Sequence, residues 1–304
     1  MEMKFPKMLT AAVMISAFGL ASCSNGDPLE NGGSSGSGGG ETIVIGSQDY
    51  YSNEIIAEIY AQALEGAGFS VDRQFRIGQR EVYVSEIESG AIDLFPEYSG
   101  PLLQYWAPDT QARKSEDVYA ELAEVTPEGL RVLDQAAATD QDSYAVTSEF
   151  AAQWSLSSIE DLAGVSVPMV LGANSEAETR PNGPRGLRDV YGIDVGFTPI
   201  EDGGGPLTVK ALTDNQIQLA IIYTASPSVV NNNLVTLSDP RGQFLASHVV
   251  PVASDDVSDE AAEVVNAVSA VLTERDLIEL NARSVNEQTA ASVIAKDWLV
   301  AKGL

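Results

Sequence analysis

Short apolar runs alternate with amphipathic stretches along most of this chain, and this alternation constrains the fold more than any other feature. Thr42–Ser47 reads TIVIGS, which is the pattern of a short buried strand. The next stretch, NEIIAEIYAQALEGAG, places Ile55, Ile56 and Ile59 on one helical face. Strands that alternate with helices in this way predict an α/β fold with mainly parallel sheets.

The pattern divides into two units. A polar stretch near Ala138–Ser143 separates two series of strands and helices. Amphipathic helices predicted over residues 259–302 have no partner unless they return to cover the first series. We therefore expect two lobes with a cleft between them. The first lobe comprises residues 41–140 and 225–304, and the second comprises residues 141–224.

The N-terminus has the layout of a secretory signal peptide. Lys4 and Lys7 precede an uncharged run over residues 8–22, which is too short for a transmembrane helix of about 20 residues. Cys23 follows Leu-Ala-Ser, and this motif resembles the lipobox of bacterial lipoproteins. The resemblance implies that residues 1–22 are removed and that Cys23 carries a lipid. The alternative is ordinary cleavage nearby, which would leave Cys23 as a free thiol.

Residues 23–40 are rich in Gly and Ser and carry little hydrophobic surface, so we expect a flexible tether. With a lipid on Cys23, the tether would hold the folded part at the extracytoplasmic face of the cell membrane. The sequence has no cysteine besides Cys23, so the folded part forms no disulfide and relies on its hydrophobic core.

The net charge is −27, from 17 Lys and Arg against 44 Asp and Glu. Nucleic-acid binding depends on basic surface that neutralises phosphates, so this balance excludes most nucleic-acid partners. It also argues against contact with anionic lipid headgroups, which leaves the lipid anchor as the expected membrane contact. A strongly negative surface favours cationic ligands, although it does not specify a fold.

The sequence lacks the motifs of common enzymes and cofactor-binding proteins. It contains no GxGxxG after a strand, no P-loop and no GxSxG, and His248 is its single histidine. We therefore expect no cofactor, no metal site and no catalytic residue, and we favour a receptor that captures a ligand. A cell-surface hydrolase is the less favoured alternative, because His248 alone offers a histidine base.

Several stretches resemble one known family. They are IVIGSQDYYSNEIIAEIYAQALEGAGF, IGQREV, ESGAIDLFPEYSGPLLQYW, SYAV, ETRPNGPRGLRDVYG, VKALTDNQIQLAIIYT and VVPVAS, of which IDLFPEYSG is the most specific. The chain resembles the substrate-binding proteins of osmoprotectant ABC importers, which capture glycine betaine, choline, carnitine and related quaternary amines. The resemblance implies a bilobal, type II periplasmic-binding-protein-like fold, a monomer, and an ABC permease and ATPase as partners.

The resemblance also implies an aromatic cage. A trimethylammonium group has no N–H to donate, so aromatic faces hold it through cation–π attraction of roughly 0.5–2 kcal/mol per ring. Tyr98 in PEYSG, Tyr144 in SYAV and Tyr223 in IIYT stand at the family's cage positions. Tyr98 and Tyr223 each follow a predicted strand, where open α/β sheets bind ligands. For any one of these tyrosines taken alone, half-buried packing is the favoured interpretation, and it is the three together at matching motif positions that indicate a cage.

Polar residues complete the expected pocket. Arg180 in ETRPNG matches the family's arginine that can hold a ligand carboxylate, and a surface salt bridge is its alternative role. Gln48 stands where the family often has lysine, and it can hydrogen-bond a hydroxyl or a carbonyl. Arg80 in GQREV is expected to face the cleft, which makes sense with a zwitterionic ligand.

Departures from the family pattern leave the ligand open. Val209 stands where the family commonly supplies another cage tyrosine, and Pro101 replaces a threonine. Tyr50 or Tyr51 could restore a wall of the cage. Choline, carnitine or a larger trimethylammonium compound then suits the pocket as well as glycine betaine does.

A second possibility keeps the receptor fold and changes the ligand to an amino acid or another small zwitterion. A primary ammonium needs a carboxylate partner, which Asp49 or Asp142 could supply. In either case we expect the two lobes to close over the ligand by a hinge motion.

Overall fold

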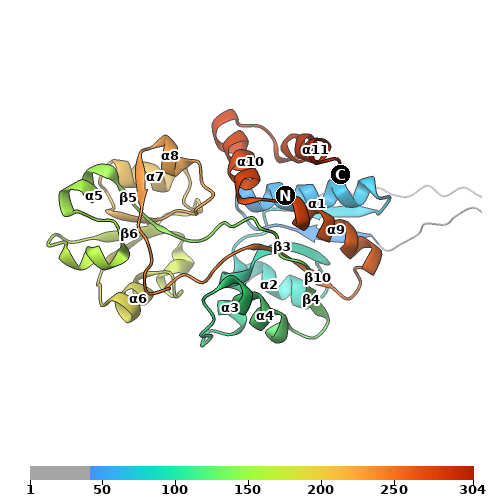
Figure 1. The fold of residues 1–304 in the computed structure, drawn as a ribbon, viewed down its shortest axis with the longest axis horizontal. Coiled ribbons are helices and arrows are strands. Elements are labelled where there is room, and N and C mark those ends of the chain that lie inside the picture. The colour runs from blue at the N-terminus through green and yellow to red at the C-terminus, as the bar shows by residue number, and fades with distance from the viewer. Residues whose placement is uncertain (1–41) are drawn as a thin grey trace, which may run out of the picture. The chain divides into compact units, whose positions relative to one another are not determined.

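The computed structural model describes residues 42–304, which belong to one compact unit. This unit contains two five-stranded sheets, each with its own helices, which we call the first and second lobes (Figure 1). The α/β class with two lobes is therefore confirmed. The predicted signal peptide, Cys23 and the tether lie outside the described residues.

The first lobe surrounds a mixed sheet. Its strands are β1 (Ile43–Gly46), β2 (Val71–Gln74), β3 (Leu94–Tyr98), β4 (Leu130–Val132) and β10 (Val249–Ser254). Its helices are α1 (Tyr51–Gly66), α2 (Arg80–Glu88), α3 (Ser99–Trp106), α4 (Ser115–Val125), α9 (Asp259–Val271), α10 (Glu274–Glu287) and α11 (Ala291–Lys302). The strand order is β2-β1-β3-β10-β4, in which β10 runs antiparallel to both of its neighbours.

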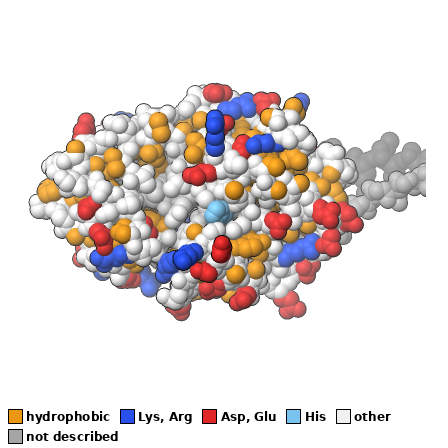
Figure 2. Space-filling model, viewed as in Figure 1, with side chains coloured by type: hydrophobic (Ala, Val, Ile, Leu, Met, Phe, Trp, Pro, Cys, Tyr) orange, Lys and Arg blue, Asp and Glu red, His pale blue; other side chains and the backbone are white. Residues whose placement is uncertain are grey.

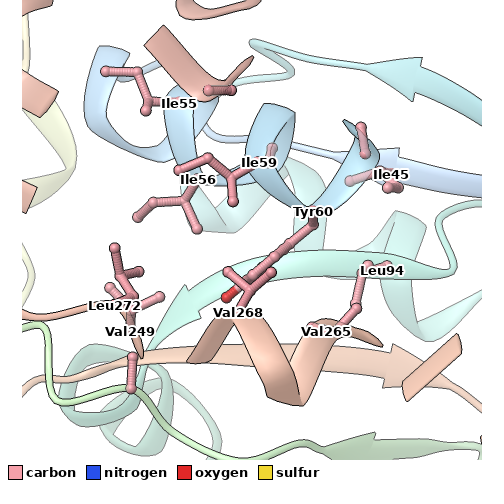
Figure 3. Close-up of a cluster of buried hydrophobic side chains, with 14 of the residues drawn as sticks. Ile45, Ile55, Ile56, Ile59, Tyr60, Leu94, Val249, Val265, Val268 and Leu272 are labelled. Atoms are coloured by element: carbon pink, nitrogen blue, oxygen red, sulfur yellow. The ribbon is translucent and has the colours of Figure 1, made fainter. Parts of the chain in front are cut away.

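The main hydrophobic core lies where α1 packs against the first sheet and the C-terminal helices. Figure 3 shows Tyr60 of α1 extending toward Val268 of α9, and both side chains are fully buried. Trp298 of α11 joins the same cluster. The amphipathic C-terminal helices thus return to cover the first lobe, as their apolar faces predicted.

The second lobe surrounds another mixed sheet. Its strands are β5 (Tyr144–Thr147), β6 (Val170–Ala173), β7 (Gly196–Pro199), β8 (Leu219–Ile221) and β9 (Leu234–Thr236). Its helical segments are α5 (Ser148–Trp154), η1 (Ile159–Gly164), η2 (Ser175–Glu178), α6 (Pro184–Gly186), η3 (Leu187–Tyr191), α7 (Pro206–Thr213) and α8 (Ser228–Asn231). The strand order is β7-β6-β8-β5-β9.

Both sheets follow one plan. Four strands of each sheet run in the same direction, as the prediction of mainly parallel sheets requires, and the strand that arrives from the other lobe, β10 or β5, takes the fourth position and runs antiparallel to its neighbours. The predicted lobe boundary after residue 224 is wrong. Val235 of β9 pairs with Val146 of β5, so the chain stays in the second lobe until β9 has completed that sheet.

The two segments that connect the lobes run side by side. Thr139 and His248 form an antiparallel bridge, and the backbone N–H of Val249 donates to the carbonyl of Ala138. The His248 Nδ1 atom lies 3.0 Å from the carbonyl oxygen of Ala136. Paired backbone at this point supplies a hinge about which the lobes can bend.

Acidic side chains spread over both lobes on the face drawn in Figure 2, in keeping with the net charge of −27. Within residues 42–304, no helix combines the length and the apolar character needed to span a bilayer. The same residues contain no group of three or more His, Cys, Asp and Glu side chains that is suited to hold a metal ion.

Candidate ligand-binding site

A cavity lies between the lobes. Both lobes and one connecting segment contribute to it. Its walls are Gln48, Tyr50, Gln79, Arg80, Tyr98, Pro101, Asp140, Asp142, Arg180 and Tyr223. Strand ends position several of these residues, because Gln48 follows β1, Tyr98 ends β3, and Tyr223 follows β8.

Three tyrosines from the two lobes form the aromatic wall. The ring centroids of Tyr50 and Tyr223 are 4.7 Å apart with an interplanar angle of 52°, and Tyr98 lines the same cavity. Burial raises the pKa of each of these phenols, so all three are neutral at physiological pH. Neutral rings that face a common space can surround a cationic group.

Tyr50 lines the cavity, whereas Tyr51 is not among its lining residues. The Tyr51 ring stacks edge-on behind Tyr50 at 4.8 Å and packs against the first-lobe core. The Tyr50 hydroxyl donates to Asp140 Oδ2 at 3.0 Å, which fixes the ring at the cavity. Val209 stands at the position where the family commonly has a further cage tyrosine. Its side chain is buried in a small core cluster of the second lobe.

Tyr144 does not belong to this wall, and its predicted cage role is wrong. Its ring is fully buried in the second-lobe core and packs edge-on against Phe244 at 5.0 Å. Its hydroxyl donates to the carbonyl oxygen of Asn182 and accepts from Gln243 Nε2, both at 2.7 Å. The structure therefore gives Tyr144 a packing and hydrogen-bonding role.

Arg80 lines the cavity as expected, but a buried carboxylate engages it. Arg80 Nε and Nη2 each donate to Glu97, at 2.9 Å, and both side chains are buried. Burial alone would lower the pKa of Arg80, but the Glu97 carboxylate outweighs it and raises the pKa. The Tyr83 hydroxyl donates to the same carboxylate, so Arg80 belongs to a closed network.

Arg180 also lines the cavity, and it forms an ion pair across the lobes. Its Nε and Nη2 atoms donate to the two carboxylate oxygens of Glu81, on α2, at 2.9 and 2.5 Å. This parallel arrangement is the geometry in which a guanidinium would also hold a ligand carboxylate. In this structure Arg180 forms the salt bridge with Glu81.

Two aspartates of the first connecting segment bring carboxylates to the cavity. Asp140 is buried, and it accepts hydrogen bonds from the Tyr50 hydroxyl and from the Ala225 backbone N–H at 3.0 Å each. Burial raises its pKa from 3.8 to about 7. Asp142 accepts from Asn182 Nδ2 at 2.9 Å, and burial raises its pKa as well.

Gln48 and Asp49, adjacent in sequence, have different environments. The Gln48 side chain is buried at the cavity, and its Nε2 donor has no hydrogen-bond partner among the described residues. Asp49 is exposed, and its nearest cation is Arg76 at 3.9 Å, so the structure does not place Asp49 at the site. Of the two aspartates proposed for an amino-acid ligand, Asp142 alone lines the cavity.

Sequence reasoning missed two features of the site. Asp140 lies in the polar stretch between the lobes, where its sequence context indicates a junction and gives no sign of a binding residue. Gly203 adopts φ +62°, and a Cβ atom there would lie 3.5 Å from the Tyr50 ring and 3.9 Å from the Tyr223 ring. The run DGGGP could have indicated the role of Gly203, because consecutive glycines allow a left-handed backbone close to other groups.

Two α/β lobes, a paired hinge and an aromatic cavity between the lobes define a two-lobed ligand-binding protein. The chain belongs to the family described as the substrate binding domain of ABC-type glycine betaine transport systems, whose model matches residues 41–301. That match takes in both lobes.

Curated relatives agree with this family. The glycine betaine-binding protein YehZ of Escherichia coli (strain K12) is 25% identical over 276 residues, covering 86% of this chain and 90% of that protein. The carnitine transport binding protein OpuCC of Listeria monocytogenes serotype 1/2a (strain 10403S) is 21% identical, covering 98% of this chain and 97% of that protein.

Solved structures support the fold. A glycine betaine/carnitine/choline ABC transporter structure superimposes with a TM-score of 0.69 at 18% identity, covering 85% of this chain and 98% of the other. A choline-binding ABC-transporter protein in complex with choline gives a TM-score of 0.61 at 14% identity, covering 86% of this chain and 89% of the other.

Proposed function

We propose that this chain is the ligand-capturing component of an ABC importer and that it holds a quaternary ammonium compound among Tyr50, Tyr98 and Tyr223. The observation that carries the proposal is the shared cavity, which three neutral phenol rings from two lobes line together. Methyl groups on a cationic nitrogen match such a wall, because they offer charge without a hydrogen-bond donor.

Lobe closure would follow from the position of the rings. Tyr98 belongs to the first lobe and Tyr223 to the second, so a ligand that touches both favours the closed arrangement. The paired connecting segments and the Arg180–Glu81 ion pair support a closed form held at the hinge and across the cleft. The closed receptor would deliver its ligand to a permease that an ATPase subunit drives.

We propose further that Cys23 carries a lipid and that the receptor works as a monomer at the extracytoplasmic side of the cell membrane. The signal-peptide layout and the single cysteine support this location. Cys23→Ser should release the protein from the membrane fraction of cells. Full retention of the variant in that fraction would exclude the anchor.

Isothermal titration calorimetry tests the binding proposal directly. Glycine betaine, choline and carnitine should be titrated into the full chain beside a panel of amino acids. Heat from at least one trimethylated compound, and recovery of that compound unaltered, is the expected result. Asp142 at the cavity favours the amino-acid receptor as the second candidate, and binding of amino acids alone would establish it instead.

A further inference from the structure

The charges around the cavity do not cancel. Among the described residues that line it, Arg80 and Arg180 are the cations. Each already forms a two-contact ion pair with a carboxylate behind it, Arg80 with Glu97 and Arg180 with Glu81. Neither guanidinium is therefore free to receive a ligand carboxylate without giving up an existing partner.

The two aspartates of the cavity have only neutral hydrogen-bond partners. Burial raises the pKa of Asp142, and the charges of Arg180 and Arg80 lower it by a smaller amount. Asp140 accepts from a tyrosine hydroxyl and a backbone N–H, and Asp142 accepts from an asparagine amide. Such hydrogen bonds stabilise a carboxylate but add no positive charge. With both arginines paired, the lining and its immediate partners carry two more carboxylates than cations whenever Asp140 and Asp142 are ionised.

Two buried donors of the cavity wall, Gln48 Nε2 and the Tyr98 hydroxyl, have no hydrogen-bond partner within residues 42–304, and Gln48 is the one outside the aromatic wall. Gln48 Nε2 is buried at the wall and makes no hydrogen bond within residues 42–304. A buried amide donor needs an acceptor from the ligand or from water. A hydroxyl group can accept from Gln48 and donate to an aspartate at the same time, whereas a carboxylate can only accept.

We propose that the cavity selects a quaternary ammonium compound that carries a hydroxyl group and no carboxylate, with Asp140 and Asp142 as the residues that determine this specificity. This inference rests on the proposed function. A ligand carboxylate would enter beside two aspartates, where like charges repel once the aspartates are ionised, and the described residues that line the cavity offer no unpaired cation. The rings hold the ammonium group, and Gln48 holds the hydroxyl.

Titration of the full chain with choline, glycine betaine and tetramethylammonium tests the proposal. Choline has the hydroxyl, glycine betaine has a carboxylate in its place, and tetramethylammonium has neither. We expect choline to bind at least about tenfold tighter than glycine betaine, with tetramethylammonium weaker than choline. Glycine betaine binding as tightly as choline, or more tightly, would overturn the charge selection and leave the proposed function intact. Binding of none of the three would overturn both.

A substitution that removes one charge at an exposed position tests ligand selectivity without disturbing the folded core. Glu81→Gln frees Arg180 without touching the aromatic wall, and it should shift the choline-to-glycine betaine affinity ratio toward glycine betaine by about fivefold or more. Glu86→Gln, on the same helix and also exposed, is the matched control and should leave the ratio unchanged. Asp142→Asn should likewise shift the choline-to-glycine betaine affinity ratio toward glycine betaine. An unchanged ratio in both Glu81→Gln and Asp142→Asn would refute the proposal.

Discussion

The Tyr50 ring of the first lobe lies 4.7 Å, centroid to centroid, from the Tyr223 ring of the second lobe. The contact joins the lobes at the cavity, and Asp140 fixes the Tyr50 hydroxyl from the connecting segment. In the function proposed above, ligand recognition and lobe closure would therefore share the same side chains.

Replacement of the cage rings should weaken binding. Tyr98→Ala or Tyr223→Ala removes one aromatic face and should lower the affinity for the bound quaternary amine at least about tenfold, a loss of about 1.4 kcal/mol. Calorimetry measures the effect. Tyr119→Ala removes a ring from α4, away from the cavity, and serves as the control. An affinity in Tyr98→Ala equal to that of the control would remove Tyr98 from the cage.

Replacement of Tyr144 should reduce the stability of the fold and leave ligand affinity nearly unchanged. Tyr144→Leu removes a buried ring and leaves its partners Asn182 and Gln243 without their hydrogen bonds, so the free energy of unfolding should fall by about 2 kcal/mol. The affinity of the folded variant should stay within about twofold of the original, because the ring does not line the cavity. Urea unfolding and calorimetry measure the two quantities. A tenfold loss of affinity with unchanged stability would restore Tyr144 to the cage.

Asp140 should make the ligand-free protein less stable as the pH rises. Its pKa is about 7 when folded, because of burial, and 3.8 is its ordinary value. The folded state thus keeps a proton that the unfolded state loses, so stability falls between about pH 4 and pH 7. Relative to Asp140→Asn, the wild-type free energy of unfolding should drop by about 3 kcal/mol between pH 5 and pH 8. If the difference in unfolding free energy between the wild type and Asp140→Asn stayed constant from pH 5 to pH 8, this prediction would be contradicted.

The two arginines of the cavity should differ in their effect on stability. Arg80→Met leaves the buried Glu97 without its cation and should cost about 3 kcal/mol, whereas Arg180→Met breaks a partly exposed pair and should cost about 1 kcal/mol or less. Thermal unfolding of the ligand-free variants measures both costs. Equal losses would mean that burial does not distinguish the two pairs.

Much of the fold follows from local patterns in the sequence. The run of apolar residues through Leu94 and Phe95 predicted β3, and the end of that strand placed Tyr98 where ligands bind in α/β sheets. The apolar faces of the C-terminal helices required a partner, which α1 supplies. These features depend on residues close together in the chain, so periodicity reveals them.

The remaining features depend on tertiary contacts. Tyr144, Ala145 and Val146 are all buried, because β5 is an inner strand covered on both faces, and no alternation indicates which face Tyr144 takes. The pairing of Arg180 with Glu81 joins residues 99 positions apart in different lobes. The membership of β9 in the second sheet likewise depends on its partner strand rather than on its own short sequence.

The central claim is that tyrosines from both lobes enclose a methylated ammonium group. A crystal structure of the chain grown with choline or glycine betaine tests it most directly. We predict the quaternary nitrogen within about 6 Å of the ring centroids of Tyr50, Tyr98 and Tyr223. A ligand held elsewhere, or a nitrogen in the cavity that contacts none of the three rings, would contradict the claim.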